Sequence, residues 1–452
     1  MKALTKYENG SMAELWSVSW PLIVASAANM LMLFGDRLIL SLYSSEAFNA
    51  NVAAIPWIWT VYIPLYSIVF IACILVGRYN GAGTYEKIGP AVWQMLWLSL
   101  SLLVPLLPLS WYLAPHLLAS NVRPLGTPYL RIILPSVPLS LAAFGAMAAF
   151  FTGRGKTCFV TVVALACNLI NLCLDALLVF GFGPIPSMGI RGAAWGTVLS
   201  QVAALLLFAY FLFTKENGKN FCIFDARPNK KIFFECLRIG SPPALSCAVN
   251  FSLWSYVLQV MANQVDKDNF TAFGIATTVY HLPLFVVEGV SLGVGAIVAN
   301  AYGAGNWKWV ERNARSWFRV SLAVLLASFV LMVLCPGPLS KPFIHGQWNA
   351  AQMHTLRTML FFSWLAIASE SFGFNLRQTL TAFGDTVFTM LVGLIGYGCI
   401  VAVPSYFALH LTHNASSFLA IEAVGQISIA IAFFFRCQRH WFLPNLARSN
   451  KC

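Results

Sequence analysis

The residues best suited to do chemistry form a polar stripe in an otherwise apolar segment, residues 157–182. Asn168, Asn171 and Asp175 follow one another at i, i+3 and i+7, a spacing that places all three side chains on one face of an α-helix. Amide oxygens beside a carboxylate hold a proton or a small cation. A polar stripe that only holds helices together is the alternative, but such contacts contribute only about 0.6–2 kcal/mol each. Two amides and a carboxylate are more than that structural role needs. The stripe therefore predicts an ion or proton site.

Asp36 stands out in the same way in the first apolar segment, residues 15–43. A charged group at the centre of a bilayer costs about 2.5–3.5 kcal/mol, and such groups usually face the protein interior or a water cavity on an ion pathway. A structural ion pair, or a place near a helix end, is the alternative explanation. The acidic residues inside apolar segments are Asp36, Asp175, Glu288, Glu370 and Glu422.

The elements that must position these residues are long apolar segments. The chain has 452 residues, of which 59% are hydrophobic and 10% charged, with a mean hydropathy of +0.72, whereas soluble domains are about a quarter charged. Each segment is long enough to cross about 30 Å of hydrocarbon as a helix. We therefore predict an all-α integral membrane protein with twelve transmembrane helices, at 15–43, 52–77, 90–119, 128–152, 157–182, 189–214, 233–263, 270–302, 313–340, 353–382, 386–412 and 416–435.

The net charge of +12 does not indicate nucleic acid, because the basic residues follow the loops. With a cytoplasmic N-terminus, most of the loop Lys and Arg fall on the cytoplasmic side, including the basic stretch at 215–231. This pattern predicts a multi-pass plasma-membrane protein (inner membrane if the source is bacterial) with both termini cytoplasmic. Lipid headgroups are its neighbours. The eleven cysteines are scattered without a CxxC pair, which disfavours a metal site or a disulfide framework.

The two halves of the chain resemble each other. VGRYNGAGTYEKI at 76–88 aligns with VANAYGAGNWKWV at 298–310, and FTGRGKT at 151–157 aligns with LTAFGDT at 380–386. Both matches fall at the same place in a six-helix order, which predicts parallel repeats related by an axis along the membrane normal. Transporters built this way hold substrate between the halves. The predicted parts are an N-terminal six-helix lobe at 1–214, a cytoplasmic linker at 215–232 and a C-terminal six-helix lobe at 233–452.

These features together resemble the multidrug and toxic compound extrusion (MATE) antiporters over essentially the whole chain. Pro21 stands fifteen residues before Asp36, as in the first helix of that family. The fifth and sixth segments contain N-x-x-N-x-x-x-D, then a glycine-rich turn, then GIRGAAWGTVLSQ, and the PYLR, GAG and GDT sequences also match. The resemblance implies two pseudo-symmetric bundles of six helices.

The N-terminal half is closer to the DinF-like branch of the family, in which this half binds the coupling proton. Pro21 falls where the first helix of that branch bends, so the resemblance implies a hinge there. The turn FGFGPIPSMG is longer than in that branch. The residues that correspond to the proton site of the branch are Asp36, Asn171, Asp175 and Thr197, and the helical spacing adds Asn168.

The C-terminal half departs from the Na⁺-coupled NorM branch, where a glutamate on helix seven and an aspartate on helix ten form a cation site. The matching positions here are Asn250 and Glu370, so the acid on helix seven is missing, which disfavours a NorM-type sodium site. Glu288 and Glu422 are the candidate partners of Glu370, since Glu422 occupies the place of Thr197 in the internal repeat. These four residues are secondary candidates for an ion site.

Arg37 is a further departure, because the family usually has a small polar residue after this aspartate. Neighbouring residues lie about 100° apart around a helix, so Arg37 and Asp36 do not share a face. Long cationic side chains near span ends usually extend to the membrane surface, and we expect this of Arg37. A gating pair with Asp36 is the alternative.

We predict a secondary transporter, not an enzyme, that exports organic cationic or amphipathic compounds in exchange for protons by rocking of its two lobes. The sequence contains neither a phosphate loop nor a nucleophile elbow, so no motif indicates ATP hydrolysis or catalysis. The lack of nucleotide motifs also disfavours a nucleotide-driven pump. We expect no cofactor or metal, small organic substrates and the bilayer as partners, and function as a monomer. Sodium coupling and a lipid-linked saccharide flippase are the alternatives. The arginines of the central spans are too few for a flippase: Arg37, Arg131, Arg357 and Arg377.

Overall fold

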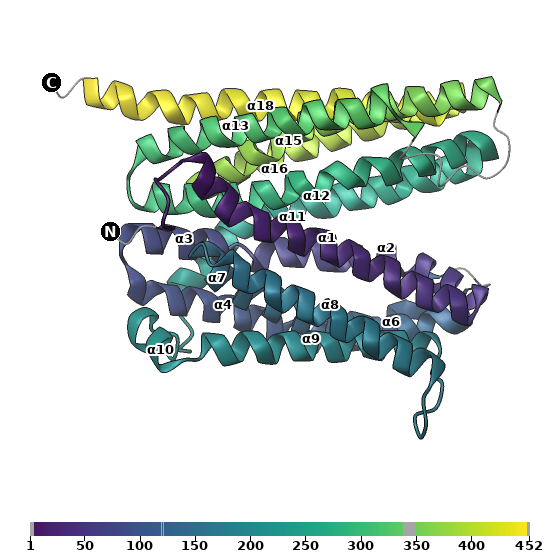
Figure 1. The fold of residues 1–452 in the computed structure, drawn as a ribbon, viewed down its shortest axis with the longest axis horizontal. Coiled ribbons are helices and arrows are strands. Elements are labelled where there is room, and N and C mark those ends of the chain that lie inside the picture. Colours follow the sequence, from purple (N-terminus) through teal and green to yellow (C-terminus); the bar gives the residue numbers. More distant parts are fainter. Residues whose placement is uncertain (1–3, 119, 121, 338–348, 450–452) are drawn as a thin grey trace. The chain divides into compact units, whose positions relative to one another are not determined.

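The structure is a computed structural model that describes residues 4–118, 120, 122–337 and 349–449. These residues are mostly helical, and they contain no strand beyond an isolated bridge between Phe182 and Ile185. Within the described ranges, 12 helical segments are long and apolar enough to cross a membrane. Each predicted segment overlaps one of these, which confirms the all-α membrane fold. Figure 1 shows the succession of helices along the chain.

Several of the first six spans consist of more than one helix. Three prolines inside the fourth span remove backbone donors, and the chain then passes through a wide turn of π-helix, as expected where the regular hydrogen-bond ladder is disturbed. The elements are α1 (Met12–Tyr43), α2 (Ser45–Val69), α3 (Ala72–Ala82), η1 (Tyr85–Lys87), α4 (Ile88–Ser101), α5 (Leu103–Leu117), α6 (Arg123–Ser140), η2 (Leu141–Met147), α7 (Ala148–Gly153), α8 (Thr157–Phe180) and α9 (Ile190–Leu212).

The second six spans follow a short linker helix, α10 (Lys215–Phe221). Two of these spans also include a π-helical turn. The elements are α11 (Lys230–Gln264), α12 (Lys267–Gly303), α13 (Trp307–Phe329), η3 (Val330–Leu334), α15 (Ala350–Phe383), α16 (Thr386–Ile395), η5 (Gly396–Ala402), α17 (Val403–Thr412) and α18 (Ala415–Ser449).

Contacts divide the chain into two compact units whose boundaries lie inside helices. Unit 1 contains Trp20–Ala244 and Ala299–Trp307, whereas unit 2 contains Tyr7–Ser19, Leu245–Val298 and the chain from Lys308 onward. Helices α1, α11 and α12 therefore each begin in one unit and end in the other. The two lobes predicted in simple chain order stay a prediction.

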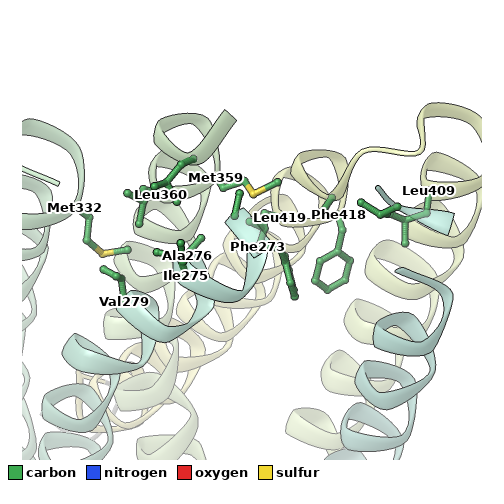
Figure 2. Packing of buried hydrophobic residues seen from close by; sticks show 14 of the residues in the cluster. Phe273, Ile275, Ala276, Val279, Met332, Met359, Leu360, Leu409, Phe418 and Leu419 are labelled. Carbon is green, nitrogen blue, oxygen red and sulfur yellow. The ribbon is translucent and has the colours of Figure 1, made fainter. Parts of the chain in front are cut away.

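The core of unit 2 is a cluster of apolar side chains from its helices (Figure 2). Figure 2 shows Phe273 and Val279 of α12 with Met332, Met359 and Phe418 from later helices. The rings of Phe273 and Phe418 lie 6.1 Å apart in an edge-to-face arrangement. Because lipid tails are as apolar as these side chains, close packing rather than removal from water holds such helices together.

The two glycine turns of the repeat meet inside unit 1. A Cβ at Gly81 would lie 1.9 Å from the carbonyl oxygen of Asn300, and one at Gly303 would lie 2.0 Å from that of Arg78. Each glycine is thus pressed against the backbone of the residue three positions before its counterpart, at the repeat offset of 222 residues. Asn80 Nδ2 also donates a hydrogen bond of 2.6 Å to Asn300 Oδ1. This crossing repeats the sequence symmetry in three dimensions.

The segment after α10 is bound to unit 1 rather than loose. The indole N–H groups of Trp93 and Trp97 donate hydrogen bonds of 2.6 and 2.9 Å to the carbonyls of Ile223 and Ala226. The side chain of Gln94 accepts from the backbone N–H of Asn229 at 3.0 Å. The predicted cytoplasmic linker at 215–232 is therefore tied to α4 over much of its length.

Candidate ion-coupling site

Helices α1 and α8 lie side by side in unit 1. Thr161 Oγ1 donates a hydrogen bond of 2.5 Å to the carbonyl of Pro21, and Asn168 Nδ2 donates one of 3.2 Å to Asn29 Oδ1. The residue numbers of the bonded partners increase together along α1 and α8, which shows that the two helices run in the same direction. The polar stripe on α8 therefore faces α1, and Asn168 is engaged there by an amide rather than by a carboxylate.

The same register brings two carboxyl groups together. Glycine at position 35 lets α1 approach α8, because an added Cβ would lie 2.3 Å from Leu172 Cδ2. One residue later, the carboxyl group of Asp36 lies within hydrogen-bonding reach of that of Asp175. Asp175 is fully buried and Asp36 is 9% exposed. Two carboxylates in such a place repel each other, so a shared proton or a bound cation would stabilise the pair.

Asn171 and Thr197 lie next to this pair. Asn171 Nδ2 is 3.3 Å from Asp175 Oδ1 and 3.4 Å from Thr197 Oγ1. The Thr197 hydroxyl donates to the carbonyl of Ala193 on its own helix at 3.0 Å, which directs its lone pairs toward the amide. The structure therefore brings together, on α1, α8 and α9, the four residues for which the resemblance predicted a proton site.

Gly196 makes this arrangement sterically feasible, and sequence reasoning missed it. An added Cβ would lie 2.0 Å from Asp175 Oδ1 and 3.2 Å from the Asp175 backbone nitrogen. Without a side chain at this position, the carboxyl group rests directly against α9. The signal in the sequence is the run of small residues in GIRGAAWG, which permits close helix packing.

Tyr129 on α6 and Asn51 on α2 also border the acid pair, and neither was predicted. The Tyr129 hydroxyl lies near the Asn51 side chain and within electrostatic range of Asp36 and Asp175. Tyr129 is 6% exposed and Asn51 is 1% exposed. A phenol both donates and accepts hydrogen bonds, so the Tyr129 hydroxyl can reorient when the charge of the acid pair changes.

The expectation that the Arg37 side chain extends to the membrane surface stays a prediction. Arg37 is half-buried, and its Nε is covered by protein without a hydrogen-bond partner. It also lies within electrostatic range of Asp36 and Tyr129. With Asp36, Asp175 and Arg37 all ionised, the cluster carries one net negative charge, which one proton or one monovalent cation neutralises.

The secondary candidates gather in unit 2 around Glu370. The Tyr280 hydroxyl donates a hydrogen bond of 2.5 Å to Glu370 Oε2, and Glu370 is 5% exposed. Glu288, Glu422 and Arg377 all lie within electrostatic range of Glu370. The guanidinium of Arg377 is thus a built-in positive charge beside these acids.

Glu370 also lines a small cavity. Its volume is about 30 Å³ and its lining includes Glu370, Arg377, Tyr397 and Gln426, which is room for one or two water molecules. Two of the lining residues, Tyr397 and Gln426, make a hydrogen bond of 3.2 Å with each other. Asn250 on α11, the remaining secondary candidate, is half-buried. Among the described residues, no group of three or more His, Cys, Asp or Glu side chains is arranged to hold a metal ion.

A family model described as MatE matches residues 21–177 and 243–407, which together exceed half of the chain. The chain belongs to the MATE family. The two matches begin at residues 21 and 243, 222 positions apart, and this is the offset of the two glycine turns. Each half therefore carries one copy of the family unit. The predicted membership in the MATE family is confirmed, whereas the DinF-like branch stays a prediction.

Relatives and solved structures agree with this membership of the MATE family. The chain is 26% identical over 344 residues to a probable multidrug resistance protein NorM of Thermotoga maritima, covering 73% of this chain and 72% of that one. It is 24% identical over 444 residues to one of Pseudomonas putida, covering 93% of each. A solved outward-facing structure of a multidrug resistance MATE family transporter of the MOP superfamily matches with a TM-score of 0.84 over 96% of both chains, at 18% identity. This last likeness supports the fold.

Proposed function

We propose that this MATE-family transporter is an antiporter that exports organic cationic or amphipathic compounds in exchange for protons. The observation that carries the proposal is the buried pair of Asp36 and Asp175, which Gly35 and Gly196 allow to come together. The multidrug names of the relatives support the class of substrate.

The charge balance of the cluster suggests how a proton acts. With Arg37 nearby, one proton on the acid pair makes the cluster neutral, and loss of that proton leaves one negative charge. A buried unbalanced charge is costly, so the deprotonated site favours a state that admits water or a cationic substrate. The protonated site favours closer packing of α1 against α8.

Coupling in both directions follows from thermodynamic linkage. If a proton on the acid pair lowers the affinity for substrate, bound substrate must favour release of that proton by the same factor. Rocking of the two six-helix halves then exposes the substrate site alternately to the two sides. Pro21 interrupts the hydrogen bonding of α1 and is the proposed hinge.

The proposal is tested with purified protein in liposomes. A pH gradient is imposed and transport of ethidium, a flat cationic dye, is followed by fluorescence for the wild type, Asp36→Asn and Asp175→Asn. Both variants should lose gradient-driven transport. Asp225→Asn is the matched control, because it makes the same chemical change at an exposed aspartate of the linker.

A sodium gradient without a pH gradient separates the two coupling ions. Carboxylate, amide and hydroxyl oxygens suit hard cations, so this arm decides between proton and sodium at the same site. The proposal predicts transport with the pH gradient alone. Full transport by both aspartate variants, or transport that follows sodium only, would refute the proton site.

A further inference from the structure

Glu14 is a fully buried acid that has no part in the mechanism above. It is 0% exposed, and its Oε2 accepts hydrogen bonds from the backbone N–H of Gly10 at 2.6 Å and from the indole N–H of Trp309 at 2.8 Å. Gly10 lies just before α1, Glu14 lies in the first turn of α1, and Trp309 lies in the first turn of α13. The bond from Trp309 links the two segments, and the bond from Gly10 holds the carboxylate in place; hydrogen bonds to an ionised carboxylate are about twice as strong as neutral ones.

Two further contacts hold this N-terminal segment on α13. The hydroxyl of Ser316 donates a hydrogen bond of 2.8 Å to the carbonyl of Gly10. Gly10 has a φ of +80°, and an added Cβ there would lie 2.5 Å from Arg312 Cβ and 2.8 Å from the Trp309 carbonyl. Trp309 and Ser316 are two turns apart on one face of α13, so the segment lies along that face. The contact therefore needs glycine at position 10 as well as Glu14.

This contact anchors one end of α1 in a different unit from the other. Residues Tyr7–Ser19 belong to unit 2, and α1 enters unit 1 at Trp20. The next residue, Pro21, lacks an N–H, so the carbonyl of Ser17 loses its helical donor. The carbonyl of Pro21 is held by Thr161 of α8. Helix α1 is thus fixed on both sides of its weakest point.

Asp36 lies on the unit 1 side of that point, on the same helix. A change in the packing of α1 against α8 at Asp36 acts on unit 2 through α1 only if the start of α1 is held there. If the first turn of α1 were not anchored, the helix would bend at Pro21 or move together with unit 1. The change in packing at Asp36 would then have no effect on unit 2.

We propose that Glu14 is a positioning residue that anchors the start of α1 on α13, so that the ion-coupled movement of α1 drives unit 2. This inference rests on the proposed antiport but concerns a residue outside the ion site. Glu14 does not bind substrate or the coupling ion; it makes the movement of α1 effective.

The test compares transport with binding. Glu14→Ala should lower the maximal rate of ethidium transport in liposomes about tenfold or more, while the KM and the affinity of the detergent-solubilised protein for ethidium stay within about twofold of the wild type. Glu14→Gln, which keeps an oxygen that accepts both N–H groups, should retain most of the rate. Trp309→Phe should resemble Glu14→Ala, and the double variant should lose no more than either single one.

Glu8→Gln is the matched control. Glu8 lies in the same segment and pairs with Arg312, but both side chains are exposed, where an ion pair contributes little. Transport at the wild-type rate by Glu14→Ala would overturn the anchor role. A loss of ethidium affinity in parallel with the loss of rate would also overturn it, because such a result marks a residue needed only for folding. If sodium rather than a proton drives the wild type, the proposed coupling ion fails, yet Glu14→Ala must still slow that transport.

Discussion

The substitution Gly196→Ala tests the geometry of the ion site without replacing any charged or hydrogen-bonding side chain. The new Cβ would lie 2.0 Å from Asp175 Oδ1, which is far inside van der Waals contact. The Asp175 backbone nitrogen, 3.2 Å away, belongs to a packed helix and gives way by a few tenths of an ångström at most. The Asp175 side chain must therefore rotate away from α9.

The cost follows from the contacts that this rotation breaks. Asp175 loses the bond from Asn171, and a hydrogen bond to a charged group contributes about 1.5–3 kcal/mol. An off-rotamer side chain adds about 0.5–1.5 kcal/mol. The sum is about 2–4.5 kcal/mol, which predicts a loss of coupled transport of about 30-fold or more at 1.36 kcal/mol per factor of ten.

The assay is ethidium transport in liposomes under a fixed pH gradient. Gly274→Ala is the control, because nothing lies within 4 Å of a Cβ at this helical glycine, and it should transport like the wild type. If Gly196→Ala also transports at the wild-type rate, Asp175 does not need its contact with α9, and the description of the site is wrong.

Two further predictions concern the turns of the internal repeat. Gly81→Val should lower the free energy of unfolding of the purified protein by about 1–3 kcal/mol, because its Cβ would lie 1.9 Å from the backbone of Asn300. Gly274→Val is the control, and an equal melting temperature for the two variants would contradict the close crossing. In the turn at Asp385, burial raises the pKa of this carboxyl, but hydrogen bonds from Arg436 and His440 outweigh that effect and lower it below its usual value. The resulting stability is present above about pH 3.9 and is lost as the pH falls through the lower value of the folded state. Melting curves of the wild type should therefore show an acid-dependent component that Asp385→Asn lacks.

The sequence predicted much of the fold because the relevant signals are local. Apolar segments of sufficient length define the spans, and the GAG repeat defines the two halves. The spacing of Asn171 and Asp175 placed both on one helix face, and the structure shows that this face meets Asp36 on α1. These features depend on helix periodicity, which a sequence displays directly.

The features that sequence reasoning missed depend on contacts between distant segments. Gly196 is one small residue among several until Asp175 is seen against it, and Tyr129 and Asn51 join the site only through the packing of α6 and α2. Glu14 stood just before the first predicted apolar segment, where an acid is ordinarily solvated. Only the contact with Trp309 shows that it is buried.

Binding of a cationic substrate should displace the proton from the Asp36–Asp175 pair, and proton release measures this exchange directly. Purified protein in weakly buffered detergent is mixed with ethidium while a pH-sensitive dye reports the protons set free. By the charge balance of the cluster, the wild type should release about one proton for each ethidium bound, whereas Asp36→Asn and Asp175→Asn should release none. Equal release by the wild type and both variants would show that the Asp36–Asp175 pair is not the group that exchanges a proton for substrate.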